Sequence, residues 1–464
     1  MSVYDLIVIG GGAGGLVSAG FAATLGVKTA LISDSPLGGE CLYTGCVPSK
    51  ALLHAAKAAR VSKADNGFSQ AMAAVKQAIT DIEPHDSPEH IQDAYGVSKI
   101  IQGRAAFVDP HTVEVNGEQL KARKFVIATG ASVFIPKIDG LNEVDYWTHE
   151  TIFDQVSQTK SLAIIGGGPI GVEMGQAFQR LGTQVHLIQR GGRILPKDEP
   201  EASGCIQDVL QAEGVQLYLN QSPVQVKAEG ENMVLTLNTT SGETSTLTIE
   251  RLLIATGKKP LQDPMRLDKA GVEFIPGKGI PVDERCRTSA SHIWSVGDVT
   301  SRFQFTHYAE HQAKVAITNG FLKWPMTMES RVVPWVTYTD PEVAHVGMVY
   351  EAAKQHHQNI LRLRIDLDVV DRFIVEQETK GFAEILVKPD GEILGATLVC
   401  VGAGELIHEV VLAMQQKIKI QALADVIHAY PTRSDLWKLL ANEYSKKALL
   451  NGWKKSVVSW WARL

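Results

Sequence analysis

Two cysteines separated by four residues are the part of this sequence best suited to chemistry. Cys41 and Cys46 lie in the string Gly38-Gly39-Glu40-Cys41-Leu42-Tyr43-Thr44-Gly45-Cys46-Val47-Pro48-Ser49-Lys50, shortly after a glycine loop that begins at Gly10. Two neighbouring thiols can form a disulfide, and this disulfide can take up two electrons and, as the dithiol, pass them to an acceptor. The order of these motifs therefore places a candidate redox dithiol beside a candidate dinucleotide site.

The other cysteines narrow the interpretation of this pair. Cys205, Cys286 and Cys400 are scattered along the chain, which is not the pattern of a secreted disulfide framework. Cys41 and Cys46 are thus interpreted as a redox pair or as metal ligands. Metal is the weaker interpretation, since the sequence shows no second cysteine pair or Cys/His cluster to complete four ligands.

A glycine loop of the form GxGxxG occurs twice, each time after a short apolar strand and before a helical pattern. Glycine permits the tight turn and the close approach of a pyrophosphate to the N-terminus of the helix. One such loop is weak support, whereas two in strand–loop–helix order favour two dinucleotide-binding units. The glycines are Gly10, Gly12 and Gly15 in the first loop, and Gly166, Gly168 and Gly171 in the second.

Further strand patterns position these loops. The strands at 125–130 and 252–257 each end in Ala-Thr-Gly, and the strand at 293–298 ends in the acid Asp298. From about Arg331 onward, strand-like and helical pieces alternate without a glycine loop. The predicted fold class is α/β, with two Rossmann-like dinucleotide-binding domains and a C-terminal α+β domain.

Composition sets broad limits on function. The chain has 464 residues and a net charge of -6, which argues against nucleic acid as a main partner. The N-terminus enters an apolar strand at Leu6–Ile9 without a basic segment, so no signal peptide is expected. No apolar run approaches the roughly 20 residues of a membrane span. A cytoplasmic protein is therefore predicted.

Together these motifs resemble the flavin-dependent pyridine nucleotide-disulfide oxidoreductases. The resemblance covers nearly the whole chain and is closest to the mercuric-reductase-like branch, through 84–89, 305–307 and 430–432. It implies FAD on the first loop, NAD(P)H on the second, and a homodimer in which one chain completes the other's active site. The implied domains are 1–149 with 277–328 for FAD, 150–276 for NAD(P), 329–450 for the dimer interface, and an amphipathic tail at 451–464.

The resemblance also implies roles for individual residues. Cys41 would be the interchange thiol that meets the substrate, and Cys46 would lie against the flavin, as a thiolate stabilised by a helix that starts near Gly45. Lys50 would pair with Glu173 beside the flavin. The implied FAD contacts are Gly10, Gly12, Gly15, Ser33, Asp34, Lys50, Ala105, Thr129, Gly130, Asp298, Thr306 and His307, and the implied NAD(P) contacts are Gly166, Gly168, Gly171, Gln189, Arg190 and Gly257.

Two departures from the family pattern concern the nucleotides. The acid expected at the end of the second FAD strand is replaced by Ser33, with Asp34 next in sequence. Asp34 would hold the adenosine ribose if the strand end shifts by one residue; otherwise Ser33 makes a weaker, neutral hydrogen bond. On the second nucleotide strand, Gln189 takes the place of an acid that would repel a 2′-phosphate. Arg190, assisted by Arg193, can bind that phosphate. NADPH is therefore expected, with NADH the alternative.

A third departure concerns acid–base catalysis. The family's base dyad of histidine and glutamate is replaced here by Tyr430 and Asp435. A phenol that titrates near about 10 is a poor proton acceptor at pH 7, although it can donate a hydrogen bond to a thiolate. His428, two residues earlier, is an alternative base.

The tail carries tryptophans and leucines at helical spacing, with lysines between them, over residues 449–464. This pattern suits a membrane interface. Packing on the protein's own surface and binding of a protein partner remain as alternatives.

The predicted activity is electron transfer from NAD(P)H through FAD to the Cys41–Cys46 disulfide, and on to a small-molecule or protein disulfide or another thiol-reactive acceptor. One alternative is Hg(II) reduction, although soft Hg(II) prefers several thiolates and only two are evident. Another alternative is a membrane-associated relay in which the flavin passes electrons to a quinone or a protein partner.

Overall fold

The computed structural model describes residues 3–62, 67–260, 265–300, 302–450 and 460–461, and it separates into two compact units. Unit 1 comprises residues 1–190 and 221–328, and unit 2 comprises 191–220 and 329–464. The four-part domain division made from the sequence stays a prediction. Residues 191–220, which the sequence assigned to the NAD(P) part, group with the C-terminal segment.

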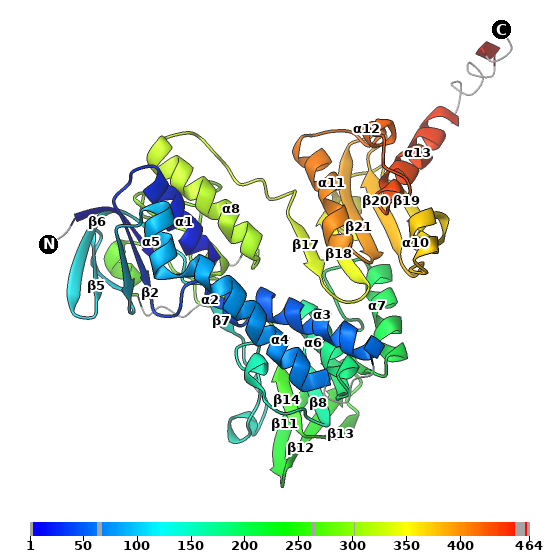
Figure 1. Ribbon diagram of the computed structural model, residues 1–464, viewed down its shortest axis with the longest axis horizontal. Helices are drawn as coiled ribbons and strands as arrows, with labels where there is room; N and C mark the ends of the chain where they lie inside the picture. Colours follow the sequence, from blue (N-terminus) through cyan, green and yellow to red (C-terminus); the bar gives the residue numbers. More distant parts are fainter. Residues whose placement is uncertain (1–2, 63–66, 261–264, 301, 451–459, 462–464) are drawn as a thin grey trace. The chain divides into compact units, whose positions relative to one another are not determined.

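A mixed sheet forms the centre of the first nucleotide-binding part of unit 1 (Figure 1). Its strand order is β3-β2-β1-β6-β5-β4, and β16 pairs with β6. The strands β3, β2, β1, β6 and β16 run parallel to one another, whereas β4, β5 and β6 form an antiparallel meander. The bounds are β1 Val3–Ile9, β2 Thr29–Ser33, β3 Lys99–Gln102, β4 Ala106–Asp109, β5 Thr112–Val115, β6 Glu118–Ile127 and β16 Ile293–Ser295.

Helices flank this sheet and carry the redox string. In Figure 1, α1 and α8 lie side by side, and α3 lies along α4. The short 3-10 helix Glu83–Asp86 separates α4 from α5. The bounds are α1 Ala13–Thr24, α2 Gly39–Tyr43, α3 Cys46–Ser62, α4 Gly67–Ile82, α5 Pro88–Tyr95 and α8 Thr306–Ile317.

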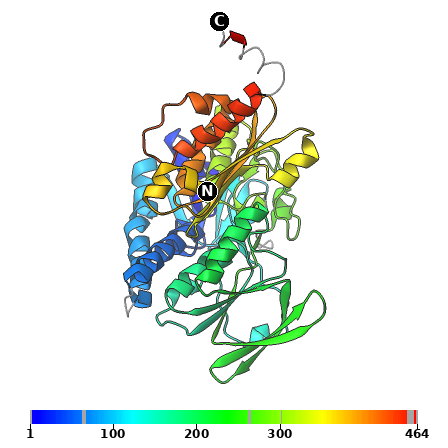
Figure 2. The same ribbon diagram turned by 90° about the vertical axis from the view of Figure 1, so that its right-hand side faces the viewer.

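The second nucleotide-binding part of unit 1 repeats the strand–loop–helix order of the first. Parallel pairing joins β8 to β9 and to β14, and the helix α6 follows the second glycine loop. An antiparallel ribbon of β11, β12 and β13 (green in Figure 2) lies in the same unit, as does the pair β7 and β15. The bounds are β7 Ala131–Val133, β8 Ser161–Ile165, α6 Pro169–Arg180, β9 Gln184–Gln189, β11 Gln221–Glu229, β12 Asn232–Thr239, β13 Thr244–Ile249, β14 Arg251–Ile254 and β15 Lys258–Pro260.

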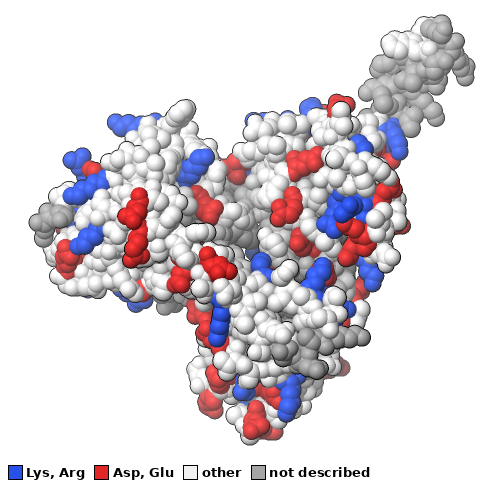
Figure 3. All heavy atoms as spheres, viewed as in Figure 1, with Lys and Arg blue, Asp and Glu red and all other residues white. Residues whose placement is uncertain are grey.

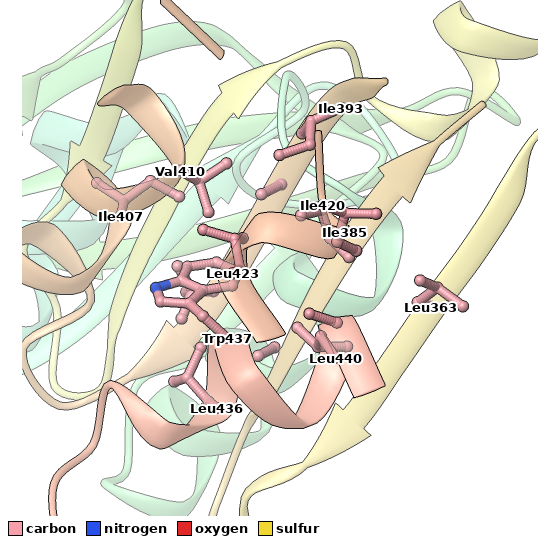
Figure 4. Close-up of a cluster of buried hydrophobic side chains, with 14 of the residues drawn as sticks. Leu363, Ile385, Ile393, Ile407, Val410, Ile420, Leu423, Leu436, Trp437 and Leu440 are labelled. Carbon is pink, nitrogen blue, oxygen red and sulfur yellow. The ribbon is translucent and has the colours of Figure 1, made fainter. Parts of the chain in front are cut away.

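Unit 2 is built on an antiparallel sheet of order β17-β18-β21-β20-β19. Helices α11 and α13 pack on this sheet, and Trp437, Ile407 and Ile385 meet in its core (Figure 4). The bounds are α7 Pro200–Ala212, β10 Gln216–Leu219, β17 Pro334–Thr337, β18 Glu342–Gly347, α9 Tyr350–His356, β19 Leu361–Asp366, α10 Asp371–Val375, β20 Phe382–Val387, β21 Ile393–Cys400, α11 Ala403–Gln415, α12 Gln421–Asp425 and α13 Asp435–Leu450.

This architecture confirms the predicted fold class, because both glycine loops join a strand to a helix and the C-terminal part is a separate antiparallel sheet with helices. Across the described residues, no helix combines the length and the apolar character needed to cross a membrane. The predicted amphipathic tail falls almost entirely outside the described residues; Trp460 and Trp461 are described, and both are exposed.

Candidate active site

The two redox cysteines lie at the junction of two helices. Cys41 is on the short helix α2, and Cys46 is the first residue of α3, where the amide of Ser49 donates to the carbonyl of Gly45 at 3.2 Å. The predicted helix start beside Cys46 is therefore present. Both cysteines are free thiols, with Cys41 half-buried and Cys46 exposed. The positive end of the α3 dipole favours a thiolate on Cys46.

The surroundings of the pair favour one thiolate over two. A hydrogen bond from Cys41 lowers the pKa of Cys46 to about 6. The protein around the sulfur partly desolvates it and opposes this lowering, although the residue as a whole is exposed, and Thr306 and the Lys50 ammonium add to the lowering. The Thr306 hydroxyl lies 3.5 Å from the Cys46 sulfur. The hydrogen bond to Cys46, together with burial, raises the pKa of Cys41. In the dithiol form the proton therefore belongs to Cys41 and the negative charge to Cys46.

A partly buried ion pair connects α3 to α6. The Lys50 ammonium on α3 lies 2.9 Å from a carboxylate oxygen of Glu173 on α6, and the Glu173 side chain is 4% exposed. The pairing predicted from sequence is thus formed. A cation held in this way is suited to stabilise negative charge that develops beside the dithiol.

The first glycine loop has the shape that a pyrophosphate requires. Gly10 has φ = 114°, and a Cβ on Gly15 would lie 1.8 Å from the Gly10 carbonyl oxygen, so a side chain there is excluded by the backbone. Gly12 caps α1 without a side-chain hydrogen bond, and a Cβ on it would meet nothing within 4 Å. The N-terminus of α1 is therefore open to a phosphate, which fits FAD.

The second loop repeats this geometry. Gly166 has φ = 119°, a Cβ on Gly171 would lie 1.9 Å from the Gly166 carbonyl oxygen, and Gly168 faces open space at the start of α6. The chain therefore presents two open helix N-termini of the same construction. This geometry fits a second dinucleotide, NAD(P)H.

The two residues expected near the adenosine ribose, Ser33 and Asp34, lie at the end of β2. The strand β2 ends at Ser33, which is buried; its hydroxyl donates to the carbonyl of Ser35 at 2.7 Å, and a Cβ on Gly11 would collide with it. Asp34 instead forms an exposed ion pair with Arg104 at 3.2 Å. The strand end is not shifted, so Ser33 holds the position of the missing acid.

The matching end of the second loop contains an amide and an exposed cation. Gln189 ends β9 and accepts a hydrogen bond from the amide of Gly167 at 3.1 Å, and Arg190 follows it exposed. Arg193 donates to the carbonyls of Pro196 and Asp198 at 2.9 and 3.3 Å, so its guanidinium is already engaged. Arg190 is thus the better candidate for a 2′-phosphate.

The remaining predicted FAD residues lie in unit 1, beside the ends of several strands and at the start of α8. Asp298 begins a 3-10 turn after β16 and forms a short contact with the ammonium of Lys258. His307 stacks on Phe305 at 5.3 Å between ring centroids, at the start of α8. Ala105 is buried just before β4, and Thr129 and Gly130 lie between β6 and β7. Gly257, which the sequence assigned to NAD(P) and not to FAD, immediately precedes β15.

The C-terminal acid–base candidates are arranged differently from the family dyad. The Tyr430 hydroxyl donates to a carboxylate oxygen of Asp371 at 2.7 Å, whereas Asp435 accepts from Lys438 at 2.5 Å. His428 has both ring nitrogens engaged, by Glu409 and by the carbonyl of Val426, and its side chain is 5% exposed. Tyr430 is 73% exposed. The exposed candidate is therefore a phenol oriented by Asp371, and not His428.

Sequence reasoning missed three residues of these arrangements. Lys258 and His149 both contact Glu40, next to Cys41, and Asp371 contacts Tyr430. Asp371 precedes Tyr430 by 59 residues, so spacing carried no signal for it. Lys258 had a weak signal, because it directly follows the second Ala-Thr-Gly strand.

Comparison with known proteins agrees with this site. Residues 4–313 match the family model "Pyridine nucleotide-disulphide oxidoreductase", and residues 333–441 match the dimerisation domain of that family. The chain belongs to this family: it is an NAD(P)H-dependent flavoprotein disulfide oxidoreductase with Cys41 and Cys46 as the redox pair. The dimerisation domain implies a homodimer.

Individual relatives carry different names. A mercuric reductase from Lysinibacillus sphaericus is 35% identical over 457 residues, covering 96% of this chain and 83% of that protein. A dihydrolipoyl dehydrogenase from Thermus scotoductus is 32% identical, covering 97% and 99%. The solved structure of the HOCl-induced flavoprotein disulfide reductase RclA from Escherichia coli aligns with TM-score 0.87 and 26% identity, covering 95% and 99%.

Proposed function

We propose that this enzyme takes electrons preferentially from NADPH and uses the Cys41–Cys46 dithiol to reduce a disulfide or another thiol-reactive acceptor. In the net reaction, NADPH and one proton reduce the enzyme disulfide to two thiols, and these thiols then reduce the acceptor while the disulfide re-forms. The bound FAD supplies the carrier that accepts a hydride and passes the electron pair to sulfur.

The observation that carries this proposal is the asymmetry within the dithiol. Cys46 starts α3, has a pKa lowered to about 6 and lies 3.5 Å from the Thr306 hydroxyl, whereas the pKa of Cys41 is raised. A thiolate held on Cys46 suits contact with a flavin, and the neutral thiol of Cys41 is the group left to exchange with an acceptor.

The preference for NADPH rests on the end of β9. Gln189 is neutral, and the exposed Arg190 offers a guanidinium to a 2′-phosphate. In the dimer that the family implies, the exposed Tyr430 would reach the partner's dithiol and donate a hydrogen bond to a departing thiolate. Asp371 would orient that phenol.

The decisive experiment is an anaerobic titration of the FAD-loaded enzyme with NADPH and with NADH in parallel. We expect a long-wavelength thiolate-to-flavin absorption band after two electrons, reached with less NADPH than NADH. Cys46→Ser should abolish the band. If Cys46→Ser turns over the acceptor as fast as the native enzyme, the dithiol is not on the electron path, and a flavin relay to a quinone or a protein partner replaces this proposal.

Hg(II) reduction is a second candidate, favoured by the names of several relatives. The other cysteines give it little support: Cys286 and Cys400 are buried, and burial raises the pKa of each to about 12. Within the described residues, no group of three or more His, Cys, Asp or Glu side chains is arranged to hold a metal ion. Mercury-dependent oxidation of NADPH in excess thiol would establish this activity, and its absence at saturating metal would remove it.

We also propose that the C-terminal tail, residues 451–464, contacts a membrane surface. Trp460 and Trp461 are 60% and 68% exposed, and aromatic side chains suit the interface of a bilayer. On the face drawn in Figure 3, acidic and basic side chains are interspersed within each unit rather than gathered in one basic patch. Flotation with anionic liposomes should therefore depend on residues 451–464, and equal flotation without them would remove the anchoring role.

A further inference from the structure

A cluster of four charged or titratable side chains in unit 1 joins the redox string to the expected FAD site. The Lys258 ammonium lies 2.9 and 3.1 Å from the two carboxylate oxygens of Glu40 and forms a short contact with Asp298. The imidazole Nε2 of His149 lies 3.2 Å from the Glu40 carboxylate. The four side chains come from four separate parts of the chain.

Each member of this cluster has a definite position relative to the site. Glu40 is on α2 and immediately precedes Cys41, and Asp298 begins the turn after β16. Lys258 is the first residue of β15, directly after Gly257. Lys258 therefore bridges two carboxylates. One is Glu40, beside Cys41, and the other is Asp298, which is expected to contact FAD.

Burial makes these contacts strong. The side chains of Lys258, Asp298 and His149 are 13%, 15% and 7% exposed, and that of Glu40 is 33% exposed. Burial alone would raise the pKa of Glu40, but the hydrogen bond to His149 and the charge of Lys258 lower it to about 2. Glu40 is thus ionised at neutral pH. Removal of Lys258 would leave two carboxylates without their shared cation.

The helix that carries Cys41 depends on such contacts. α2 spans Gly39–Tyr43, which is too short to be stable through its own backbone hydrogen bonds. Its two polar side chains hold it in place: Glu40 binds Lys258 and His149, and the Tyr43 hydroxyl donates to Glu83 at 2.9 Å. A change at Lys258 therefore reaches Cys41 through one intervening side chain.

We propose that Lys258 and Glu40 are positioning residues that couple occupancy of the FAD site to the order of the Cys41 helix. FAD bound against Asp298 fixes that carboxylate, Asp298 fixes Lys258, and Lys258 holds Glu40 and with it α2. This inference rests on the proposed function in one respect, the contact between Asp298 and FAD. It adds a positioning role for a carboxylate and a lysine to which the sequence assigned no function.

The test is hydrogen–deuterium exchange of the peptide that spans residues 38–46, measured in the homodimer without FAD and at saturating FAD. In the native enzyme, FAD should slow exchange of this peptide by about tenfold, the size expected from one charge-assisted hydrogen bond. In Glu40→Gln, and in Lys258→Met where it folds, FAD should slow exchange of this peptide by no more than about twofold. Lys258→Arg should keep most of it.

The control is Lys160→Met, which removes an exposed lysine paired with Glu250 at 3.6 Å and should leave the slowing intact. FAD binding is followed independently by the quenching of flavin fluorescence. If FAD binds and Glu40→Gln keeps the full slowing, the coupling is wrong while the proposed function stands. The coupling is equally wrong if FAD binds to the native enzyme without slowing this peptide. If the native enzyme does not bind FAD, the proposed function fails as well.

Discussion

The hydroxyl of Tyr430 donates a hydrogen bond of 2.7 Å to the carboxylate of Asp371, the first residue of α10. This contact raises the pKa of Tyr430, so the phenol keeps its proton throughout the physiological range. A group in this state can donate a hydrogen bond to a thiolate but does not remove a proton from a thiol. The pairing thus defines what the C-terminal unit can contribute to catalysis.

From this pairing we predict that Tyr430→Phe lowers turnover with a small disulfide by about tenfold or more, because the donor is lost. Asp371→Asn should lower turnover less, since an amide oxygen still accepts from the phenol. Tyr430→His should raise activity on small disulfides by restoring a base. Steady-state rates over pH 6–9 check all three, with flavin content as the control for folding. No gain in Tyr430→His with flavin intact would contradict the assignment.

The dithiol should titrate near neutrality. Because the pKa of Cys46 is lowered to about 6, its thiolate is present above that pH and is lost as the pH falls through it. The long-wavelength band of the two-electron-reduced enzyme should therefore fade with a midpoint near pH 6. Thr306→Val removes the hydroxyl 3.5 Å from the sulfur and should move the midpoint upward. Thr306→Ser retains a hydroxyl and serves as the matched control; an unchanged midpoint in the valine variant would exclude this role for Thr306.

The Lys50–Glu173 pair should matter for electron entry. In Glu173→Gln the Lys50 ammonium loses a charged partner at 2.9 Å and is held less firmly. We expect the rate at which NADPH reduces the bound flavin, followed by stopped-flow absorbance, to fall by about tenfold or more. Glu250→Gln, which alters an exposed pair with Lys160, should leave that rate unchanged. Equal rates in the two variants would argue against a role for Glu173.

Nucleotide preference is predicted to depend on Arg190. Arg190→Ala should reduce kcat/KM for NADPH by about tenfold or more and leave that for NADH within about twofold, since only NADPH carries the 2′-phosphate. Arg193→Ala is the matched control, because its guanidinium is held by the carbonyls of Pro196 and Asp198. A parallel loss for both nucleotides in Arg190→Ala would remove the proposed phosphate contact.

A buried carboxylate in unit 2 should make stability depend on pH. Burial raises the pKa of Asp198 to about 6, although Trp335 donates to it at 2.8 Å and opposes the rise. The folded state therefore keeps this proton up to about pH 6, whereas the unfolded chain releases it near pH 4. The contribution of Asp198 to the free energy of unfolding therefore decreases as the pH rises from about 4 to about 6. It is constant above about pH 6.

Asp198→Asn removes this dependence while keeping an acceptor for Trp335. Relative to the native enzyme, the variant should gain on the order of 2 kcal/mol in free energy of unfolding between pH 4 and pH 7.5. Thermal unfolding at the two pH values measures this difference. An Asp390→Asn variant, at an exposed carboxylate paired with Lys419, provides the comparison. A constant difference between Asp198→Asn and the native enzyme would show that Asp198 does not titrate in this window.

Local sequence patterns were sufficient for the elements and for contacts made by short motifs. The glycine loops and the start of α3 at Cys46 follow from nearby residues, because turn chemistry and helix capping act over a few positions. The end of β2 did not follow in this way, since the sequence left Ser33 and Asp34 as alternatives. The pairing of Lys50 with Glu173 was predicted as well, through the family resemblance and not from spacing.

Contacts between distant, unremarkable residues could not be predicted in this way. Lys258 meets Glu40 across 218 positions, and the Ala-Thr-Gly that it follows is a weak signal that does not identify this partner. Asp371 similarly looks like an ordinary residue at the start of a helix. Tertiary packing brings these partners together, and packing leaves no local pattern. The role of Asp435 shows the same limit, because its partner in the structure is Lys438.

The segment of residues 191–220 has one more consequence. Its acids bind residues of the C-terminal segment: Glu199 accepts from the amide of Tyr350, and Glu201 pairs with Arg362 at 2.8 Å. Residues 191–220 therefore lie between two segments of unit 1 in the sequence but group with the C-terminal segment in the structure. A chimera with a related reductase that exchanged 329–464 alone would separate Glu199 and Glu201 from these partners.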